Sequence, residues 1–150
     1  MMPGAIHPAP DSAQRVLDWI ELHDLMSRYV HLVDHSAWDR LDEVFTDDAV
    51  VDYRNFAPYI PRLEGLAAIQ DYFGSMEQPI AHHTVNSLIT AAEDRDLRRI
   101  TSKIVLVMRD RQIYVGEYRD RVARTDRGWR FTERLAARPF RLGNSLPVEL

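Results

Sequence analysis

Residues 98–138 read RRITSKIVLVMRDRQIYVGEYRDRVARTDRGWRFTERLAAR, and apolar and polar side chains alternate along three runs of this stretch. A period of two is the pattern of β-strands that bury one face. Polar clusters at 110–111 and 126–128 separate the runs and predict turns. We therefore expect an antiparallel meander of long strands near 82–93, 98–109, 112–125 and 128–138, with a further turn at 94–96.

The pattern before residue 81 is mainly helical. Apolar residues recur at spacings of three and four along a first helix that Asp11 or Ser12 caps and that ends near Asp34. The members of this stripe are Trp19, Leu22, Met26, Tyr29, Val30 and Val33. The segments that follow predict a helix at 37–45, a turn at 46–48, a short strand at 49–53, an irregular connection at 55–62 and a helix at 65–76. Helices followed by a run of strands indicate an α+β fold in which a curved antiparallel sheet wraps around the long N-terminal helix.

Composition excludes several classes of function. The 150 residues fit a single domain, 1–150, with a proline-rich lead-in at 1–10 and a tail at 140–150. The formal net charge is −4 with both signs interspersed, so we expect no nucleic-acid partner. No cysteine is available as a nucleophile or a metal ligand. No apolar run approaches the ~18 residues of a membrane span, so we expect no membrane partner and a cytoplasmic location.

Three ionisable residues are the candidates for chemistry: Tyr29, Asp34 and His82. Tyr29 and Asp34 fall near opposite edges of the apolar stripe of the first helix, so both side chains can lean toward an interior. Adjacent strand residues face opposite sides, so His82 and His83 cannot both point into a pocket. The alternation favours His82, because it places Thr84 and Asn86 on the same side. A carboxylate such as Asp34 beside this imidazole fixes its tautomer and stabilises the imidazolium.

Several segments together resemble the SnoaL-like family of the nuclear-transport-factor-2-like superfamily. They are IELHDLMSRYVHLVD (20–34), WDRLDEVFTDDA (38–49), HHTVN (82–86), GEYRD (116–120) and GWR (128–130). The resemblance implies a cone-shaped fold, also called cystatin-like, with a deep pocket, and association into a homodimer or homotrimer. The family includes polyketide cyclases, scytalone and bile-acid dehydratases, a dehydrochlorinase, non-catalytic binding domains and small subunits of ring-hydroxylating dioxygenases.

The resemblance also assigns roles to residues. The order and separation of Asp34 and His82 match the aspartate and histidine of the dehydratases and the dehydrochlorinase, and Tyr29 matches a tyrosine that some dehydratases use. An arginine that some members carry on the last strand is either Arg134 or Arg138. A polar residue from the second long strand is one of Thr101, Ser102 and Lys103.

These observations lead to a functional hypothesis. We expect a cofactor-independent lyase or isomerase, dehydratase- or cyclase-like, that moves a proton with His82 and Asp34 as catalytic residues, assisted by Tyr29. Its substrate is a small, largely apolar cyclic molecule contacted by Trp38, Phe73 and Asn86. The alternative is a non-catalytic small-molecule-binding or assembly domain of the same fold, including one resembling a dioxygenase small subunit.

A metal site is the other chemistry that the sequence suggests. His31 and His35 have the spacing of two ligands on one helical face, and Asp34 and Asp39 are near. That face lies away from the apolar stripe, and two histidines alone are a weak signal. We therefore expect neither a metal nor a cofactor.

Overall fold

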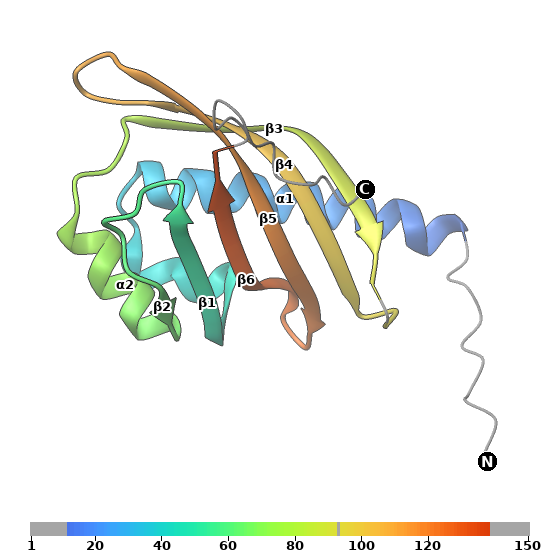
Figure 1. The fold of residues 1–150 in the computed structure, drawn as a ribbon. Coiled ribbons are helices and arrows are strands. Elements are labelled where there is room, and N and C mark those ends of the chain that lie inside the picture. The colour runs from blue at the N-terminus through green and yellow to red at the C-terminus, as the bar shows by residue number, and fades with distance from the viewer. Residues whose placement is uncertain (1–11, 93, 139–150) are drawn as a thin grey trace.

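The computed structural model describes residues 12–92 and 94–138, which form one long helix, two short helical segments and a single curved sheet (Figure 1). The elements in chain order are α1 (Ser12–Asp34), η1 (Trp38–Glu43), β1 (Phe45–Asn55), β2 (Leu63–Glu64), α2 (Leu66–Ser75), β3 (Ala81–Ala91), β4 (Leu97–Val107), β5 (Ile113–Thr125) and β6 (Gly128–Ala137). The α+β class predicted from the sequence is confirmed. The predicted lead-in at 1–10, the tail at 140–150 and Asp11 as a helix cap lie outside the described residues.

The sheet has the strand order β2-β1-β6-β5-β4-β3. The hairpins from β3 to β6 pair antiparallel as the alternation predicted, whereas β1 pairs parallel with β6. Such a pair needs a long crossover, and the chain from α2 through β5 supplies it. The strand β3 is an edge, and α1 runs across the sheet beside it (Figure 1).

Two sequence predictions about the segment 37–53 are wrong. The turn predicted at 46–48 is part of β1, which pairs with β6 at Phe45↔Phe131 and again from Val50↔Glu133, with an irregularity between these positions. The helix predicted at 37–45 is a shorter 3-10 segment, Trp38–Glu43. Aspartates at positions 47 and 48 have low strand propensity, but both are exposed and lie in this irregularity of β1, between residues that pair with β6.

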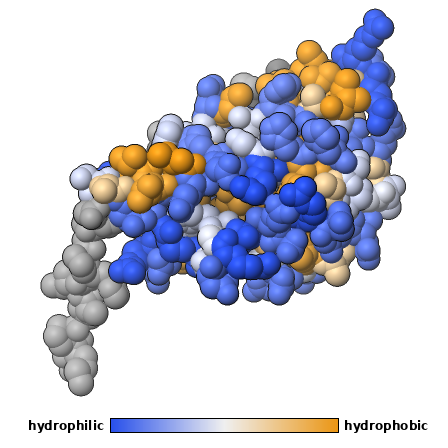
Figure 2. Space-filling view, turned by 180° about the vertical axis from the view of Figure 1, so that it is seen from behind, coloured by the Kyte–Doolittle hydropathy of each residue, from blue (hydrophilic) through white to orange (hydrophobic). Residues whose placement is uncertain are grey.

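The core lies between α1 and the concave face of the sheet. Leu22, Met26, Tyr29 and Val33 are buried there, as the helical stripe predicts. Trp19, placed in the same stripe, is instead 56% exposed, because the side of α1 that faces the sheet here is that of Asp18, which is buried and pairs with Arg98 and Arg124. A hydrophobic patch is visible on the surface where α1 begins (Figure 2). Within the described residues, no helix is long and apolar enough to cross a bilayer.

Candidate active site

A pocket of about 200 Å³ opens between the sheet, α2 and the loop that follows β1. Its wall is mostly aromatic and aliphatic, and His82 is one of its few ionisable members. The aromatic residues of the wall are Tyr29, Tyr53, Phe56, Tyr59, Phe73, Tyr114 and Tyr118. A concave apolar site with few polar groups is the usual form of a small-molecule site.

His82 and Asp34 meet at the wall of this pocket. Asp34 is the last residue of α1 and His82 is the second residue of β3, so the contact joins the end of the helix to the edge of the sheet. The His82 Nδ1 lies 2.6 Å from the Asp34 Oδ1, and the backbone N–H of His82 donates to the Asp34 Oδ2 over 3.3 Å. Because a carboxylate only accepts hydrogen bonds, the ring proton sits on Nδ1 and Nε2 carries the free lone pair.

Burial and charge act in opposite directions on the imidazole. The desolvation of His82 lowers its pKa below the ordinary 6.5, while the hydrogen bond and the charge of Asp34 partly offset that decrease. The Arg134 guanidinium lowers the pKa a little further. His82 is therefore neutral at pH 7 and can accept a proton, and Asp34 stabilises the cation that forms.

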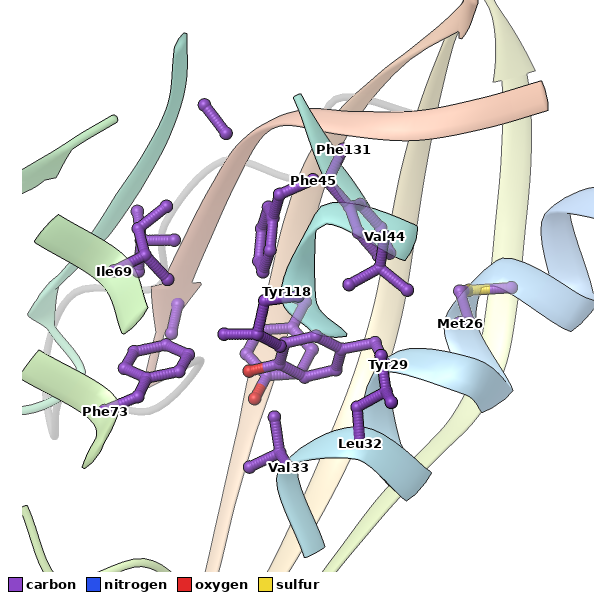
Figure 3. Packing of buried hydrophobic residues seen from close by; sticks show 14 of the residues in the cluster. Met26, Tyr29, Leu32, Val33, Val44, Phe45, Ile69, Phe73, Tyr118 and Phe131 are labelled. Carbon is purple, nitrogen blue, oxygen red and sulfur yellow. The ribbon is translucent and has the colours of Figure 1, made fainter. Parts of the chain in front are cut away.

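Two phenol groups share the interior next to this pair. The hydroxyl of Tyr29, on α1, and that of Tyr53, on β1, lie 3.1 Å apart and share a hydrogen bond. Tyr29 packs edge-on against Phe45, Phe131 and Tyr118, which fixes the direction of its ring (Figure 3). Burial raises the pKa of Tyr53 well above 10, so its phenol stays protonated. Both tyrosines line the pocket and can donate a hydrogen bond to an oxygen of a ligand.

Tyr53 was missed by sequence reasoning. The segment 49–53 was predicted to be a strand, and the alternation of Ala49, Val51 and Tyr53 does mark one buried face. That signal indicates burial, but it does not reveal which helix faces the strand. The contact with Tyr29 follows only from the parallel pairing of β1 with β6, which brings β1 alongside the pocket.

A buried ion pair lies behind the tyrosines. Arg134 on β6 is fully buried and donates two hydrogen bonds, of 2.9 and 2.8 Å, to Asp120 on β5. Its guanidinium also lies 4.0–4.2 Å from the ring centroids of Tyr29, Tyr118 and Phe131. Burial alone would lower the pKa of Arg134, but the Asp120 carboxylate raises it above its ordinary value, so Arg134 stays charged. Burial raises the pKa of Asp120, and the charge and hydrogen bonds of Arg134 partly offset that increase.

The sequence alone did not decide whether Arg134 or Arg138 is the arginine near the site. The two residues have different positions in the structure. Arg138 is exposed and belongs to the pocket wall, with its guanidinium 5.4 Å from the ring centroid of Phe56 and 5.9 Å from that of Tyr114. Arg134 is absent from that wall. Of the polar candidates on β4, Ser102 is fully buried on the concave face, whereas Lys103 faces the other side and binds Glu117.

The three predicted substrate contacts differ in outcome. Phe73 lies in the pocket wall, and its contact with a substrate stays a prediction. Trp38 does not lie there, because it packs behind Phe73 with its ring centroid 6.3 Å from that of Phe73. Asn86 is exposed and outside the pocket, because a bulge between Val85 and Leu88 shifts the register and gives Asn86 a positive φ of 52°. The predicted inward position of Asn86 is therefore wrong.

Several known proteins are similar to this chain in sequence or in fold. An uncharacterised protein of Mycobacterium tuberculosis is 27% identical over 135 residues, which are 86% of this chain and 90% of that protein. A Novosphingobium aromaticivorans structure, provisionally described as an aromatic ring hydroxylase, is 28% identical with a TM-score of 0.71 and covers 84% of this chain and 92% of its own. A second structure from that organism, provisionally described as a scytalone dehydratase, is 18% identical with a TM-score of 0.69 and covers 92% and 97%.

The sequence model of the SnoaL-like domain family matches residues 14–135 of this chain. Two other structural neighbours are described as having a cystatin-like fold, and one of them as nuclear-transport-factor-2-like, in agreement with the curved sheet and the long first helix. The resemblance predicted from the motifs is thus confirmed over nearly all of the described residues, and the chain belongs to the SnoaL-like domain family.

Proposed function

We propose that this protein is a cofactor-independent lyase or isomerase in which His82 removes a proton from a carbon of the substrate. The observation that carries the proposal is the 2.6 Å contact between the His82 Nδ1 and the Asp34 Oδ1 at the wall of an apolar pocket. A base must lie within reach of its substrate and be unprotonated at the working pH. The position of His82 in the wall and its lowered pKa support both requirements.

The proton transfer uses the geometry of the pair. The His82 Nε2 accepts the proton from a C–H bond made acidic by a neighbouring carbonyl or leaving group. The C–H electron pair forms the new double bond as an enolate forms or the leaving group departs with its own pair. Asp34 keeps the proton on Nδ1 and stabilises the imidazolium, and the apolar surroundings strengthen this electrostatic effect.

The remaining polar groups of the wall have supporting roles in this proposal. The Tyr29 and Tyr53 hydroxyls, 3.1 Å apart, bind a substrate oxygen on which negative charge develops. Arg138 offers a cation for a departing anion or a second oxygen. The aromatic wall and a volume of about 200 Å³ favour a small, largely apolar cyclic substrate.

The decisive experiment is turnover of a panel of hydroxylated and halogenated cyclic substrates by the wild type and by His82→Ala and Asp34→Asn. We expect His82→Ala to lower kcat/KM by about 10²–10⁴-fold, which is the usual contribution of a positioned general base. Asp34→Asn should lower kcat as well, because the amide cannot stabilise the imidazolium. His83→Ala is the matched control, since His83 is adjacent but exposed. Full activity in both site variants would refute the mechanism.

A non-catalytic role is the second candidate. It is supported by the 28% identity to the protein provisionally described as an aromatic ring hydroxylase, since a chain of this fold can serve such an enzyme as an assembly subunit. In that case cyclic ligands would bind the pocket without turnover, and His82→Ala would leave their affinity unchanged. Isolation of the chain in a stable complex with a larger hydroxylase subunit would favour this second role over the first.

A further inference from the structure

Arg138 is a cation in the exposed part of the pocket wall, and its charge is not balanced there. Its guanidinium contacts the rings of Phe56 and Tyr114, but it forms no ion pair with a carboxylate of residues 12–92 and 94–138. Glu77, the acidic residue of the described wall, is already paired with Arg109, 3.5 Å away. Because an arginine stays protonated at every physiological pH, the described wall carries an uncompensated positive charge.

The surroundings of Arg138 are assembled from three separate segments of the chain. Phe56 follows β1, Tyr114 lies on β5, and Arg138 itself follows β6. Gly116 on β5 makes this assembly possible, because a Cβ at that position would lie only 2.7 Å from the Phe56 Cε2. The two rings restrict the orientation of the guanidinium and shield its faces, while its N–H groups remain available as donors to an anion.

The strand registers place Arg138 far from His82 along the sheet. His82 on β3 is opposite Leu106 on β4, and Leu106 is opposite Tyr114 on β5, so the three form a row that lines the pocket. Neighbouring strands are about 4.8 Å apart, so this row is about 10 Å long, and Arg138 lies at its Tyr114 end. A leaving group departs from the carbon next to the one that loses its proton, and it therefore stays near His82. A cation at the other end suits an anionic group that the substrate keeps throughout the reaction.

We propose that the pocket selects cyclic substrates that carry a carboxylate, and that Arg138 binds this group about 10 Å from the carbon that His82 deprotonates. This inference rests on the proposed function of His82 and extends it by naming the substrate class. A guanidinium offers a carboxylate two parallel N–H donors, which fix its orientation as well as its affinity. One cation balances the single charge of a carboxylate, whereas a phosphate monoester carries nearly two. The ring system fills the apolar space between the two ends and brings its C–H bond to the His82 Nε2.

The test compares two matched probes, 2-naphthoate and the neutral 2-naphthamide, by isothermal titration calorimetry with the 150-residue chain. The probes share their ring system and nearly their shape, and they differ in charge. We expect the wild type to bind 2-naphthoate about tenfold more tightly, which is near the lower end of what a hydrogen bond to a charged group contributes. The preference should shrink as the NaCl concentration rises, because Arg138 is exposed and salt screens its charge.

Three variants locate the preference. Arg138→Gln should abolish it by weakening the binding of 2-naphthoate, and should leave the affinity for 2-naphthamide unchanged. Arg138→Lys should keep part of it, because lysine retains the charge but not the paired donors. Arg121→Gln is the matched control, since it removes an exposed arginine of β5 outside the described pocket wall, and it should keep the full preference.

Two results would overturn the inference: equal affinity of the wild type for the two probes, or a preference for 2-naphthoate that persists in Arg138→Gln. The role of His82 as the base fails separately. If His82→Ala turns over a cyclic carboxylic acid as fast as the wild type and keeps the preference for 2-naphthoate, the base is refuted and the carboxylate site stands. If the wild type turns over neutral cyclic substrates as efficiently as acids and His82→Ala does not, the substrate class is refuted and the base stands.

Discussion

Two effects act in opposite directions on the pKa of the His82 imidazole: burial lowers it, and the Asp34 carboxylate raises it. Burial is the larger and lowers the pKa below 6.5. The unfolded chain therefore binds a proton more readily than the folded protein does in this pH range. The stability that the neutral imidazole contributes is fully present above pH ~6.5 and is lost as the pH falls through the folded pKa.

At the residue scale, Asp34→Asn should lower the pKa of His82 further. The substitution removes the hydrogen bond to a carboxylate and the negative charge, the two effects that raise this pKa, and leaves the desolvation in place. The change is measured by NMR titration of the His82 ring. Asp39→Asn, at an exposed carboxylate, is the control and should leave the titration unchanged. A higher His82 pKa in Asp34→Asn would contradict this account of the pair.

His82 and Asp34 also show how much of the candidate site could be predicted from the sequence. Alternation along one strand is a local property, and it correctly placed His82 among the buried residues and His83 among the exposed ones. The contact of His82 with Asp34 joins residues 48 positions apart and was predicted from the family resemblance. The Tyr29–Tyr53 hydrogen bond had no local signal, because it depends on which strand lies opposite α1.

At the scale of the element, the bulge in β3 determines which polar residues reach the interior. Before the bulge, His82 and Thr84 face α1, and after it Ser87 does so in place of Asn86. The Ser87 Oγ donates to the Oγ of Ser102, 3.2 Å away on β4. One extra residue on one strand bends the edge and changes the side that each following side chain faces.

Asn86 adopts the unusual backbone conformation of this bulge. Its φ of 52° lies in the left-handed region, which asparagine tolerates and β-branched residues do not. Asn86→Val should therefore lower the free energy of unfolding by about 1–2 kcal/mol, whereas Asn86→Gly should leave it nearly unchanged. Urea denaturation measures both. Thr90→Val, at an exposed position of regular strand in β3, is the control and should be neutral. Equal stability of Asn86→Val and Asn86→Gly would contradict the strained backbone.

At the scale of the whole molecule, the Arg134–Asp120 pair joins the sheet to the helix. Arg134 pairs with β5 through Asp120 and stacks on Tyr29 of α1, so a single side chain links three elements in the interior. Removal of one partner of a buried ion pair leaves an uncompensated charge, which is far more unfavourable than the loss of a surface pair.

Arg134→Met should therefore destabilise the protein by about 3–5 kcal/mol in urea unfolding. Arg134→Met combined with Asp120→Asn should recover part of this loss, because no isolated charge then remains buried. Arg121→Met breaks the exposed pair with Glu133 and should change the stability by only about 0–1 kcal/mol. A similar effect of Arg134→Met and Arg121→Met would show that the buried pair does not hold the core together.

The surface of the molecule also leads to a prediction. Ile113 and Val115 on β5 are 64% and 53% exposed, and Val115 lies on the convex side of the sheet, opposite the side that Tyr114 presents to the pocket. We expect a homodimer or homotrimer that buries this apolar surface, as measured by size-exclusion chromatography with light scattering. Val115→Lys should shift the equilibrium toward monomer, whereas Leu17→Lys, in the exposed patch where α1 begins, should not. A wild type that is monomeric at high concentration would contradict this prediction.

The sequence by itself determined the α+β class, the limits of the long strands and the side that His82 faces, because each depends on the periodicity of neighbouring residues. Only the tertiary structure decided that β1 lies parallel to β6, that Tyr53 reaches Tyr29, that Arg134 is buried while Arg138 lines the pocket, and that Asn86 faces outward. Those features depend on pairing between distant strands and on a single bulge, and a shift of one residue in register moves a side chain to the other face. The His82–Asp34 pair combines both levels, since local alternation directs the imidazole inward and the packing of α1 against β3 brings the carboxylate to it.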